Sequence, residues 1–394
     1  QAGACPILLE RGGDVDSRRQ AVDTFCRTGV LDTASNVQFG EGGAGTFSDG
    51  KLNSGIKDPR CRRVLETFVE AGAPAEILWQ AKPHIGTDKL QDTVRGLREE
   101  ILRLGGQVFF RHQVTDIVIT DGALSALIVN GDKEIPCAHA VFAIGHSARD
   151  TAEMLHRRGL PMEQKPFAVG VRIEHPQELI DRAQYGTFAG HKLLGAADYA
   201  LVYHTPDKTR TAYSFCMCPG GLVVAAASES GGVVVNGMSM YNRDSGVANS
   251  ALVVNVSAED FGNAPLDGVE FQRKYEQLAY AAGGSNYHAP AQNFASFLKG
   301  TTPDVSSLVV STYRPGITPC DLTKVLPNYV CDTLRAGITD FGRKIAGYND
   351  GGALLTGVET RTSAPVRIVR DNETLQHVTV EGLFPCGEGA GYAG

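Results

Sequence analysis

Apolar residues recur along the chain with two different periods. A spacing of three or four residues predicts helices over 16–27, 60–71 and 88–104, with Asp16 or Ser17 as the cap of the first and Gly29 as its end. An Asp88-x-x-Gln91 pattern predicts a capping box for the third. Short apolar or alternating runs bounded by turn residues predict strands. In the first part of the chain these are 6–9, 107–110, 114–120, 124–130 and 140–144.

The order of these elements indicates an α/β unit. The helix that stops at Gly105 leads into a strand, and Asp121-Gly122 and Gly131-Asp132 then supply hairpin turns. We therefore expect a small antiparallel meander, followed by an apolar strand that ends in Ala143-Ile144-Gly145. Helices and strands that alternate in this way are typical of α/β domains.

The pattern changes near residues 161–166, beyond which strands dominate. Helices over 150–158, 268–282 and 325–343 accompany them, and an apolar strand over 382–386 precedes the last turn. We predict a first domain over 1–163, an inserted mixed domain over 164–363, and a return to the first domain over 364–394. The strands predicted in the insert are 167–174, 200–203, 212–216, 222–226, 233–238 and 251–256.

Composition and charge narrow the class of protein. A net charge of −7 argues against nucleic acid as a partner, and no apolar run reaches transmembrane length. Nine scattered cysteines without zinc spacing indicate no metal site and a reduced, cytoplasmic protein. Because the chain begins at Gln1 and ends at Gly394 in a turn, we expect a fragment clipped at both ends.

The closing stretch, residues 387–394, has the composition of a cofactor-binding turn. Small residues let the backbone approach a ligand, and a helix that begins there offers N–H groups and a partial positive charge. Glu388 could accept hydrogen bonds from sugar or ribityl hydroxyls. The other stretches of this kind are Glu10-Arg11-Gly12, residues 40–52 and Ala143-Ile144-Gly145.

Two of these stretches have alternative interpretations. An acid at a strand end, such as Glu10, can bind an adenosine ribose, but the glycine-rich turn should lie roughly 20 residues earlier and only nine residues precede it. A solvated strand end fits Glu10 equally. The five glycines of residues 38–52 fit a loop around a flat or phosphorylated ligand or a mobile surface loop. Leu52 after Gly50-Lys51 excludes a P-loop.

Other polar groups do not identify a reaction. Cys216 and Cys218 would share one strand face, but a bridge between them is strained, so we expect buried cysteines and no redox dithiol. His146 and Arg149 follow the Ala-x-Gly strand and fit either a cofactor-facing group or a helix start. Arginines such as Arg361 could clamp an anion or form interdomain salt bridges. Catalytic residues stay unassigned.

Several long motifs together carry a family resemblance. They are residues 7–12, 39–52, 143–151, 215–221, 241–250, 357–365 and 382–394. With these motifs the chain resembles the bacterial FAD-dependent dehydrogenases of unassigned substrate, relatives of the glutathione-reductase-like flavoproteins, over essentially its whole length. The resemblance implies an α/β fold, with a Rossmann-like FAD-binding domain of glutathione-reductase type, a β-meander crossover and an inserted mixed α/β substrate domain. Such proteins also have a GxGxxG strand-turn and a long last helix, which this chain lacks.

The resemblance also implies where FAD binds. Glu10 should hold the adenosine ribose, Arg11 should lie near the pyrophosphate, and Val114 should lie at the adenine. The loop over 42–51 should line the flavin, and the N–H groups of residues 390–393 should point at its N1–O2 edge. The predicted cofactor residues are Glu10, Arg11, Gly12, Gly42, Gly43, Ala44, Gly45, Thr46, Ser48, Asp49, Lys51, Val114, Ala143, Gly145, Gly387, Glu388, Ala390, Gly391, Tyr392 and Ala393.

The function implied is that of an FAD-dependent oxidoreductase, which transfers hydride between a small-molecule substrate and flavin. No second dinucleotide fingerprint appears, so NAD(P)H would bind only transiently, and no nucleic-acid or membrane partner is expected. Two alternatives remain open. One is a flavin-dependent hydroxylase or RNA-modifying flavoenzyme, and the other is a non-catalytic FAD-binding protein.

Overall fold

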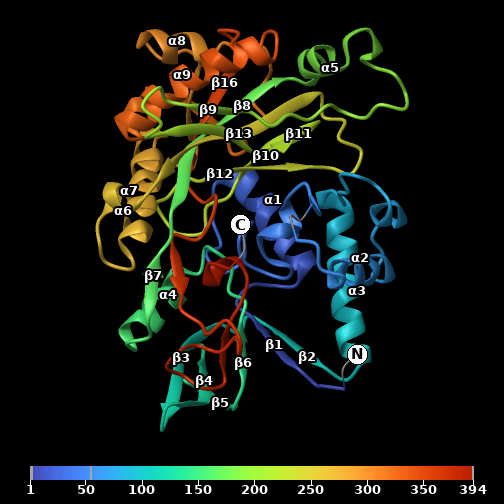
Figure 1. Ribbon diagram of the computed structural model, residues 1–394, viewed down its shortest axis with the longest axis vertical. Helices are drawn as coiled ribbons and strands as arrows, with labels where there is room; N and C mark the ends of the chain where they lie inside the picture. Colours follow the sequence, from blue (N-terminus) through green and yellow to red (C-terminus); the bar gives the residue numbers. More distant parts are fainter. Residues whose placement is uncertain (1–2, 54–55, 393–394) are drawn as a thin grey trace.

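A seven-stranded sheet forms one end of the molecule, at the top of Figure 1. The computed structural model describes residues 3–53 and 56–392 and is a mixed α/β structure. The strand order of the sheet is β15-β14-β16-β8-β13-β10-β9. Its strands are β8 (Phe167–Pro176), β9 (Val202–His204), β10 (Thr211–Cys218), β13 (Val247–Val256), β14 (Ala289–Asn293), β15 (Ile317–Pro319) and β16 (Leu354–Glu359).

The centre of this sheet is covered on both faces. β8 and β13 pair antiparallel along their whole length, with Val171 opposite Leu252, and both residues are fully buried. Runs of branched apolar residues such as these favour a strand that is buried on both faces. The surrounding elements are α5 (Gln177–Tyr185), α6 (Ala258–Phe261), α7 (Asp267–Ala282), α8 (Phe294–Lys299), α9 (Asn328–Lys344) and the antiparallel pair β11 (Gly221–Ala225) and β12 (Val235–Ser239).

All seven strands of the sheet lie inside the segment 164–363 that the sequence assigns to an insert. β7 (Met162–Gln164) and β17 (Val366–Ile368) pair antiparallel at the two ends of that segment. The exact domain boundaries stay a prediction.

Three helices lie beside the glycine-rich part of the chain: α1 (Val15–Thr28), α2 (Arg60–Glu70) and α3 (Thr87–Arg103). Gly29 ends α1 in the left-handed conformation, as predicted. The predicted caps are wrong. Asp14 caps α1, because its carboxylate accepts hydrogen bonds from the N–H groups of residues 16 and 17. Gly86 precedes α3, and Asp88 lies inside that helix and accepts a hydrogen bond from the N–H of Tyr241 at 2.8 Å.

Two separate parallel strand pairs lie below the large sheet (Figure 1). β1 (Ile7–Glu10) pairs with β2 (Gln107–Phe110), and β6 (Ala140–Phe142) pairs with β18 (Leu383–Pro385). Within residues 3–53 and 56–392, no strand pairs with the second edge of β1 or of β6. Ile7 and Val141 are 51% and 67% exposed there. The structure thus holds two parallel pairs where a glutathione-reductase-type domain predicts one sheet.

The predicted meander is present as a three-stranded antiparallel sheet. It consists of β3 (Val114–Thr120), β4 (Ala123–Val129) and β5 (Lys133–Pro136), and α4 (Arg149–Arg157) follows the next strand. β5 escaped prediction because Lys133-Glu134-Ile135-Pro136 carries only one apolar side chain between polar residues and a proline.

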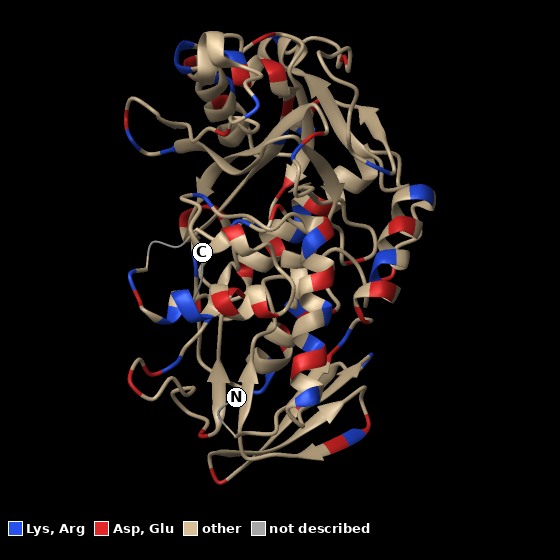
Figure 2. Ribbon diagram, turned by 90° about the vertical axis from the view of Figure 1, so that its right-hand side faces the viewer, with Lys and Arg blue, Asp and Glu red and all other residues tan. Residues whose placement is uncertain are grey.

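Charged residues concentrate on the helices and loops and are sparse on the strands of the large sheet (Figure 2). No described helix is both long enough and apolar enough to cross a membrane. Some charged side chains are nevertheless buried, among them Arg18, Arg149, Arg172, Glu276 and Arg361.

Candidate functional site

The turn after β1 lies against the glycine-rich loop. Oε1 of Glu10 accepts hydrogen bonds from the N–H of Gly12 at 2.8 Å and from the N–H of Gly40 at 2.9 Å. A Cβ added to Gly12 would lie 2.5 Å from the Cα of Gly40, so only glycine permits this contact. The fold therefore brings together two of the predicted cofactor segments.

Arg18 holds the glycine-rich loop from beneath, a role that the sequence analysis missed. Its side chain is fully buried, lies over the ring of Phe47 at 4.9 Å, and donates to backbone carbonyls at 2.6–3.5 Å. Burial lowers the pKa of Arg18 to about 10, although the charges of Glu10 and Glu41 oppose the shift. The carbonyls belong to Asn36, Val37, Gly40, Glu41 and Gly43.

The polar side chains of the loop mostly hold the loop itself. Thr46 Oγ1 donates to the carbonyl of Glu41 at 3.0 Å, and Ser48 Oγ donates to the carbonyl of Gly45 at 2.6 Å. Asp49 is buried and pairs with Lys51 at 2.9 Å and with Arg243. The contacts of these predicted cofactor residues therefore hold the shape of the loop.

The closing turn lies against the Ala-x-Gly strand end. A Cβ added to Gly389 would lie 2.3 Å from the carbonyl oxygen of Gly145, so this approach also requires glycine. Glu388 Oε1 accepts a hydrogen bond from the N–H of Ala364 at 2.7 Å, and burial raises the pKa of Glu388. The structure thus joins the other two predicted segments as a second pair.

The closing turn is a short 3₁₀ turn, Glu388–Ala390. The N–H groups of Gly391 and Tyr392 donate to the carbonyls of Glu388 and Gly387, both at 3.0 Å. These two N–H groups are therefore used inside the turn, whereas the resemblance had led us to expect that they point at the flavin. Ala390 is fully buried, and Ala393 lies outside the described residues.

Arg11 connects the two pairs. Its guanidinium donates to both carboxylate oxygens of Asp150, at 3.0 and 2.8 Å, and lies 4.2 Å from the ring centroid of Phe39. Gln113, next to Val114, donates to Asp150 Oδ2 at 2.7 Å. Arg11 thus fixes the turn after β1 to the start of α4. Through Gln113, the segment that contains Val114 also contacts the start of α4.

Whether these residues fit FAD can be judged from the space beside their glycines. No atom lies within 4 Å of the Cβ that Gly43, Gly45, Gly145 or Gly387 would carry. Gly42 differs, because its Cβ would lie 2.2 Å from Thr46 Oγ1. Bare backbone from three segments, with Glu10 and Glu388 beside it, suits a ligand that carries phosphates and hydroxyls. The residues present therefore fit FAD, with Ala44 and Ala143 as neighbours in the same segments.

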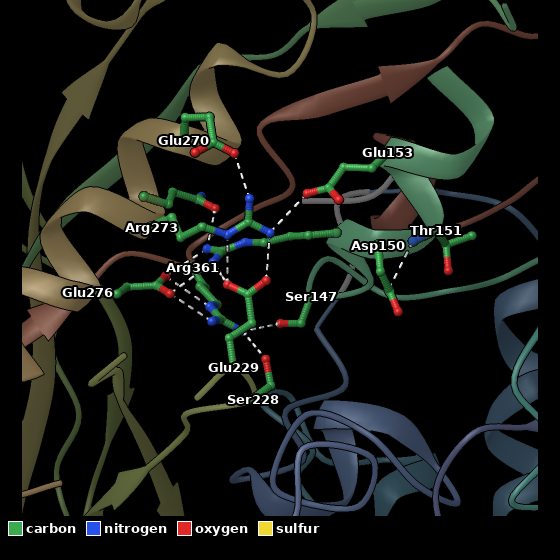
Figure 3. A network of polar contacts seen from close by, with 12 residues as sticks. Ser147, Asp150, Thr151, Glu153, Ser228, Glu229, Glu270, Arg273, Glu276 and Arg361 are labelled. Atoms are coloured by element: carbon green, nitrogen blue, oxygen red, sulfur yellow. Dashed lines mark hydrogen bonds and ion pairs between the residues drawn. The ribbon is translucent and has the colours of Figure 1, made fainter. Parts of the chain in front are cut away.

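A buried ion network joins α4 to the large sheet's domain (Figure 3). Glu276 of α7 accepts from Arg149 at 2.7 and 2.9 Å and from Arg361 at 3.0 and 2.8 Å. Burial alone would raise the pKa of Glu276, but the charges of Arg149 and Arg361 hold it well below its usual range. Arg149 and Arg361 thus both form salt bridges with a carboxylate of the protein.

The outer part of the network extends this pairing. Glu229 binds Arg149 and Arg273, each at 2.7 Å, and Arg273 also binds Glu153 of α4 at 2.9 Å. Arg361 donates to Ser147 Oγ at 2.9 Å, and Ser147 lies 2.9 Å from His146 Nδ1. A cavity of about 230 Å³ borders Glu229, Arg273 and Glu276. Because its cations are already paired, the network works as a clamp between two parts of the chain.

The described residues hold no group of three or more His, Cys, Asp and Glu that could bind a metal ion. Comparison with known proteins gives the family. The model of the family "FAD-dependent protein, C-terminal domain-like" matches residues 166–362, half of the chain. An uncharacterized protein of Clostridium beijerinckii is 54% identical over 393 residues, which cover 100% of this chain and 73% of that protein. This chain belongs to that family of FAD-dependent proteins. Its cofactor is FAD, as the sequence predicted.

Solved structures resemble this FAD-dependent protein only weakly. CtdE in complex with FAD is 12% identical, with a TM-score of 0.28, and the match covers 78% of this chain and 54% of that chain. An oxidoreductase from Methanosarcina mazei is 12% identical, with a TM-score of 0.30, over 88% of this chain and 59% of that chain. The chain thus spans somewhat more than half of the length of these proteins. Likenesses this weak carry no argument about its reaction.

Proposed function

We propose that this FAD-dependent protein is an oxidoreductase that transfers hydride between a small organic substrate and the flavin. One observation carries the proposal. Glycine contacts join four predicted cofactor segments, far apart in sequence, into two pairs, and Gly43, Gly45, Gly145 and Gly387 in these segments have no atom within 4 Å of their Cβ positions. An arrangement that packs some glycines tightly and leaves their neighbours open is suited to a ligand that lies on the backbone.

The carboxylates have distinct proposed roles. Glu10 uses Oε1 for both backbone N–H groups, which leaves Oε2 to accept from a ribose hydroxyl. Glu388 uses Oε1 for the N–H of Ala364, which leaves its second oxygen for a ribityl hydroxyl. Since each carboxylate is oriented by a backbone hydrogen bond, little side-chain entropy is lost when the ligand binds.

The chain's part in the reaction is to bind and orient. FAD, when bound, supplies the hydride-accepting chemistry. Arg18 keeps the glycine-rich loop in one shape, and Arg11 keeps the loop and the Gly145 turn in register through Asp150. The clamp around Glu276 fixes α4 against the domain of the large sheet, where a substrate would have to be held next to the flavin.

Gly45 allows a sharp test of the cofactor site. Its backbone is not left-handed, and no atom lies within 4 Å of its Cβ position, so Gly45→Val is compatible with the fold. We expect this side chain to occupy ligand space and to weaken FAD binding by roughly tenfold or more, about 1.4 kcal/mol. Gly195 is also exposed, open and not left-handed, so Gly195→Val is the matched control. Equal FAD affinity of both variants in a fluorescence titration would disprove the site.

Glu388 gives a second test of the same site. Glu388→Ala removes a charged acceptor, which is worth on the order of 1.5–3 kcal/mol, so FAD affinity should fall by roughly ten- to a hundredfold. Glu388→Gln keeps an acceptor for the N–H of Ala364 and separates loss of the ligand contact from loss of local structure. An unchanged affinity in the alanine variant would remove Glu388 from the site.

The reaction itself requires a separate measurement. The FAD-loaded protein, kept free of oxygen, should lose its flavin absorbance when a metabolite pool that contains its substrate is added. Rapid recovery in air with formation of a hydroxylated product would favour a flavin-dependent hydroxylase. A flavin that no pool and no NAD(P)H reduces would indicate a non-catalytic FAD-binding protein.

A further inference from the structure

Two cysteines lie where the large sheet meets the glycine-rich loop. Cys216 and Cys218 end β10, and the residue between them, Met217, offers its carbonyl to the ammonium group of Lys51. Lys51 closes the glycine-rich loop and pairs with Asp49 at 2.9 Å. The thiols therefore border the loop, although they come from a distant part of the chain.

The backbone at Cys216 departs from a regular strand. The register of β10 against β13 shifts between Phe215 and Cys218, and Cys216 has a φ of 44°, in the left-handed region. Bulges of this kind re-aim a side chain and are frequent next to active sites. Cys218 is buried, whereas the residue Cys216 is partly exposed.

The charges around Cys216 leave room for one more negative charge. Three cations, Lys51, Arg172 and Arg243, lie in this cluster, and the carboxylates that pair with them are Asp49 and Glu359. Arg172 also donates to the carbonyl of Cys216 at 2.9 Å. A thiolate at Cys216 would balance the remaining positive charge.

Other titratable groups nearby do not remove this surplus. Glu174, on the same strand as Arg172, accepts from the N–H and hydroxyl of Thr312 at 3.0 and 2.6 Å, and burial raises its pKa. Burial also raises the pKa of Tyr199, to about 12, and lowers that of His84. These groups are neutral or are committed to partners outside the cluster.

The pKa of Cys216 agrees with this charge count. The neighbouring Cys218 side chain and the charges of Arg172 and Lys51 lower the pKa of Cys216 well below its usual value, although burial opposes the shift. Ordinary part-buried cysteines of the same chain behave in the opposite way, since burial raises the pKa of Cys26, Cys137 and Cys320.

A free hydrogen-bond donor lies beside the thiols. Asn249 is opposite Cys218 across the β10–β13 pair and is fully buried. Its Oδ1 accepts from Arg172 at 3.1 Å, but its Nδ2 has no partner among the residues that the structure describes. A buried amide donor without a partner costs free energy, which an anionic ligand would recover.

We infer that Cys216, Cys218, Lys51 and Arg172 form a thiol site in which the Cys216 sulfur attacks small anionic electrophiles. The sulfur provides the electron pair for the new bond to an electrophilic carbon, and the leaving group departs with the electrons of the bond that breaks. The Cys218 thiol donates to the backbone carbonyl of Cys216 at 3.3 Å. A disulfide between the two cysteines would be strained, so Cys218 does not form a bridge with the nucleophile. The inference does not depend on FAD.

Alkylation of each cysteine by iodoacetamide, followed by peptide mass spectrometry, tests the nucleophile. In this reaction a sulfur–carbon bond forms and iodide leaves. Labelling of a thiol with the ordinary pKa of about 8.5 slows about tenfold per pH unit below that value. The exposed Cys5 and Cys386 are the comparison cysteines. We expect labelling of Cys216 to stay nearly constant from about pH 8 to about pH 6. A tenfold loss per unit at Cys216, or no labelling there, would overturn the inference.

Charge selectivity tests the ligand class. Iodoacetate and iodoacetamide react in the same way but differ by one negative charge. We expect the ratio of iodoacetate to iodoacetamide rates to be several-fold higher at Cys216 than at Cys5 and Cys386 in the unmodified chain. Lys51→Met should lower that ratio at Cys216, whereas Lys82→Met, at an exposed lysine paired with Asp198, should not. An equal ratio at all three cysteines would contradict the assignment to anions.

Discussion

Two of the regions that bury arginine surround it in different ways. Beneath the glycine-rich loop, Arg18 is surrounded by backbone carbonyls, and its pKa falls to about 10. In the clamp, Arg149 and Arg361 meet the carboxylate of Glu276. Glu276 and Glu229 raise the pKa of Arg149 above its usual value despite its burial, whereas burial and the charge of Arg149 lower the pKa of Arg361.

The difference reflects what each region has to hold. A loop of glycines has few side chains to grip, so the guanidinium of Arg18 fixes it through its carbonyl oxygens. Two parts of a chain that meet through helices can use side chains from both, so charges are paired across the junction. The first arrangement shapes a backbone surface, and the second fixes an orientation.

The largest effect is expected at the centre of the clamp. Glu276→Ala would leave two buried arginines without their shared partner, and breaking a buried ion pair in this way costs about 3–5 kcal/mol of unfolding free energy. Denaturant unfolding measures the change. Glu178→Ala, at an exposed pair with Arg182, is the control and should change stability by less than about 1 kcal/mol.

The pH dependence of this variant gives a further check. Because the pKa of Glu276 is depressed in the folded state, its stabilisation is present above the ordinary Glu pKa of about 4.3 and is lost as pH falls through the folded value. The difference between the wild type and Glu276→Ala should therefore shrink in acid. A difference that is constant across this range would mean that packing, not charge, holds the junction.

His175 tests whether the large sheet tolerates an unpaired cation. It is fully buried, its Nε2 lies 2.8 Å from the carbonyl of Tyr348, and burial lowers its pKa to about 4. The unfolded value is about 6.5, so stability should be complete above that pH and fall by up to about 3 kcal/mol as pH drops towards 4.

His175→Gln keeps a donor for the Tyr348 carbonyl but cannot take up a proton. We expect it to lose the part of the pH slope between about 4 and 6.5 that His175 contributes. His156→Gln, at an exposed histidine, is the control for the substitution itself. Identical slopes in the wild type and His175→Gln would show that the sheet admits the charge.

A smaller and more local effect is expected at Arg18. Arg18→Met fills a similar space but releases the carbonyls of the glycine-rich loop, and an unpaired buried polar group costs about 1–3 kcal/mol before the loop relaxes towards water. Hydrogen exchange should rise in residues 36–43, and FAD affinity should fall. Arg18→Lys should not restore either property, because a lysine lacks the planar fork of donors. Full recovery with lysine would mean that charge alone holds the loop.

Much of the element order followed from the sequence because it rests on local periodicity. The meander and the helices over α7 and α9 appear where their apolar spacing predicted them. The helix caps were harder to predict from the sequence. Asp14 accepts hydrogen bonds from the first N–H groups of its own helix, whereas Asp88 accepts one from the distant Tyr241, and only the fold decides between such partners. The family's FAD cofactor came from long motifs and not from any single residue.

Arg18 shows what a sequence leaves out, and also a signal that could have been used. It lies on the same face of α1 as Val15, Val22 and Phe25, where an apolar residue would be expected. An arginine on an apolar stripe indicates a buried partner, but nothing in the sequence identifies that partner as the carbonyls of a loop. The bulge at Cys216 was hidden for a related reason, because period-two spacing assumes a regular strand.

The open edges of β1 and β6 have a consequence for the behaviour of this chain in concentrated solution. Among residues 3–53 and 56–392 neither edge has a strand partner, and apolar side chains are exposed there, with Leu8 42% exposed on β1 and Val141 67% exposed on β6. Such edges act as templates for any extended segment that diffuses past them. Association through them is favoured by concentration and opposed by charge, so the colloidal stability of the molecule is set by two short strands far from its dense sheet.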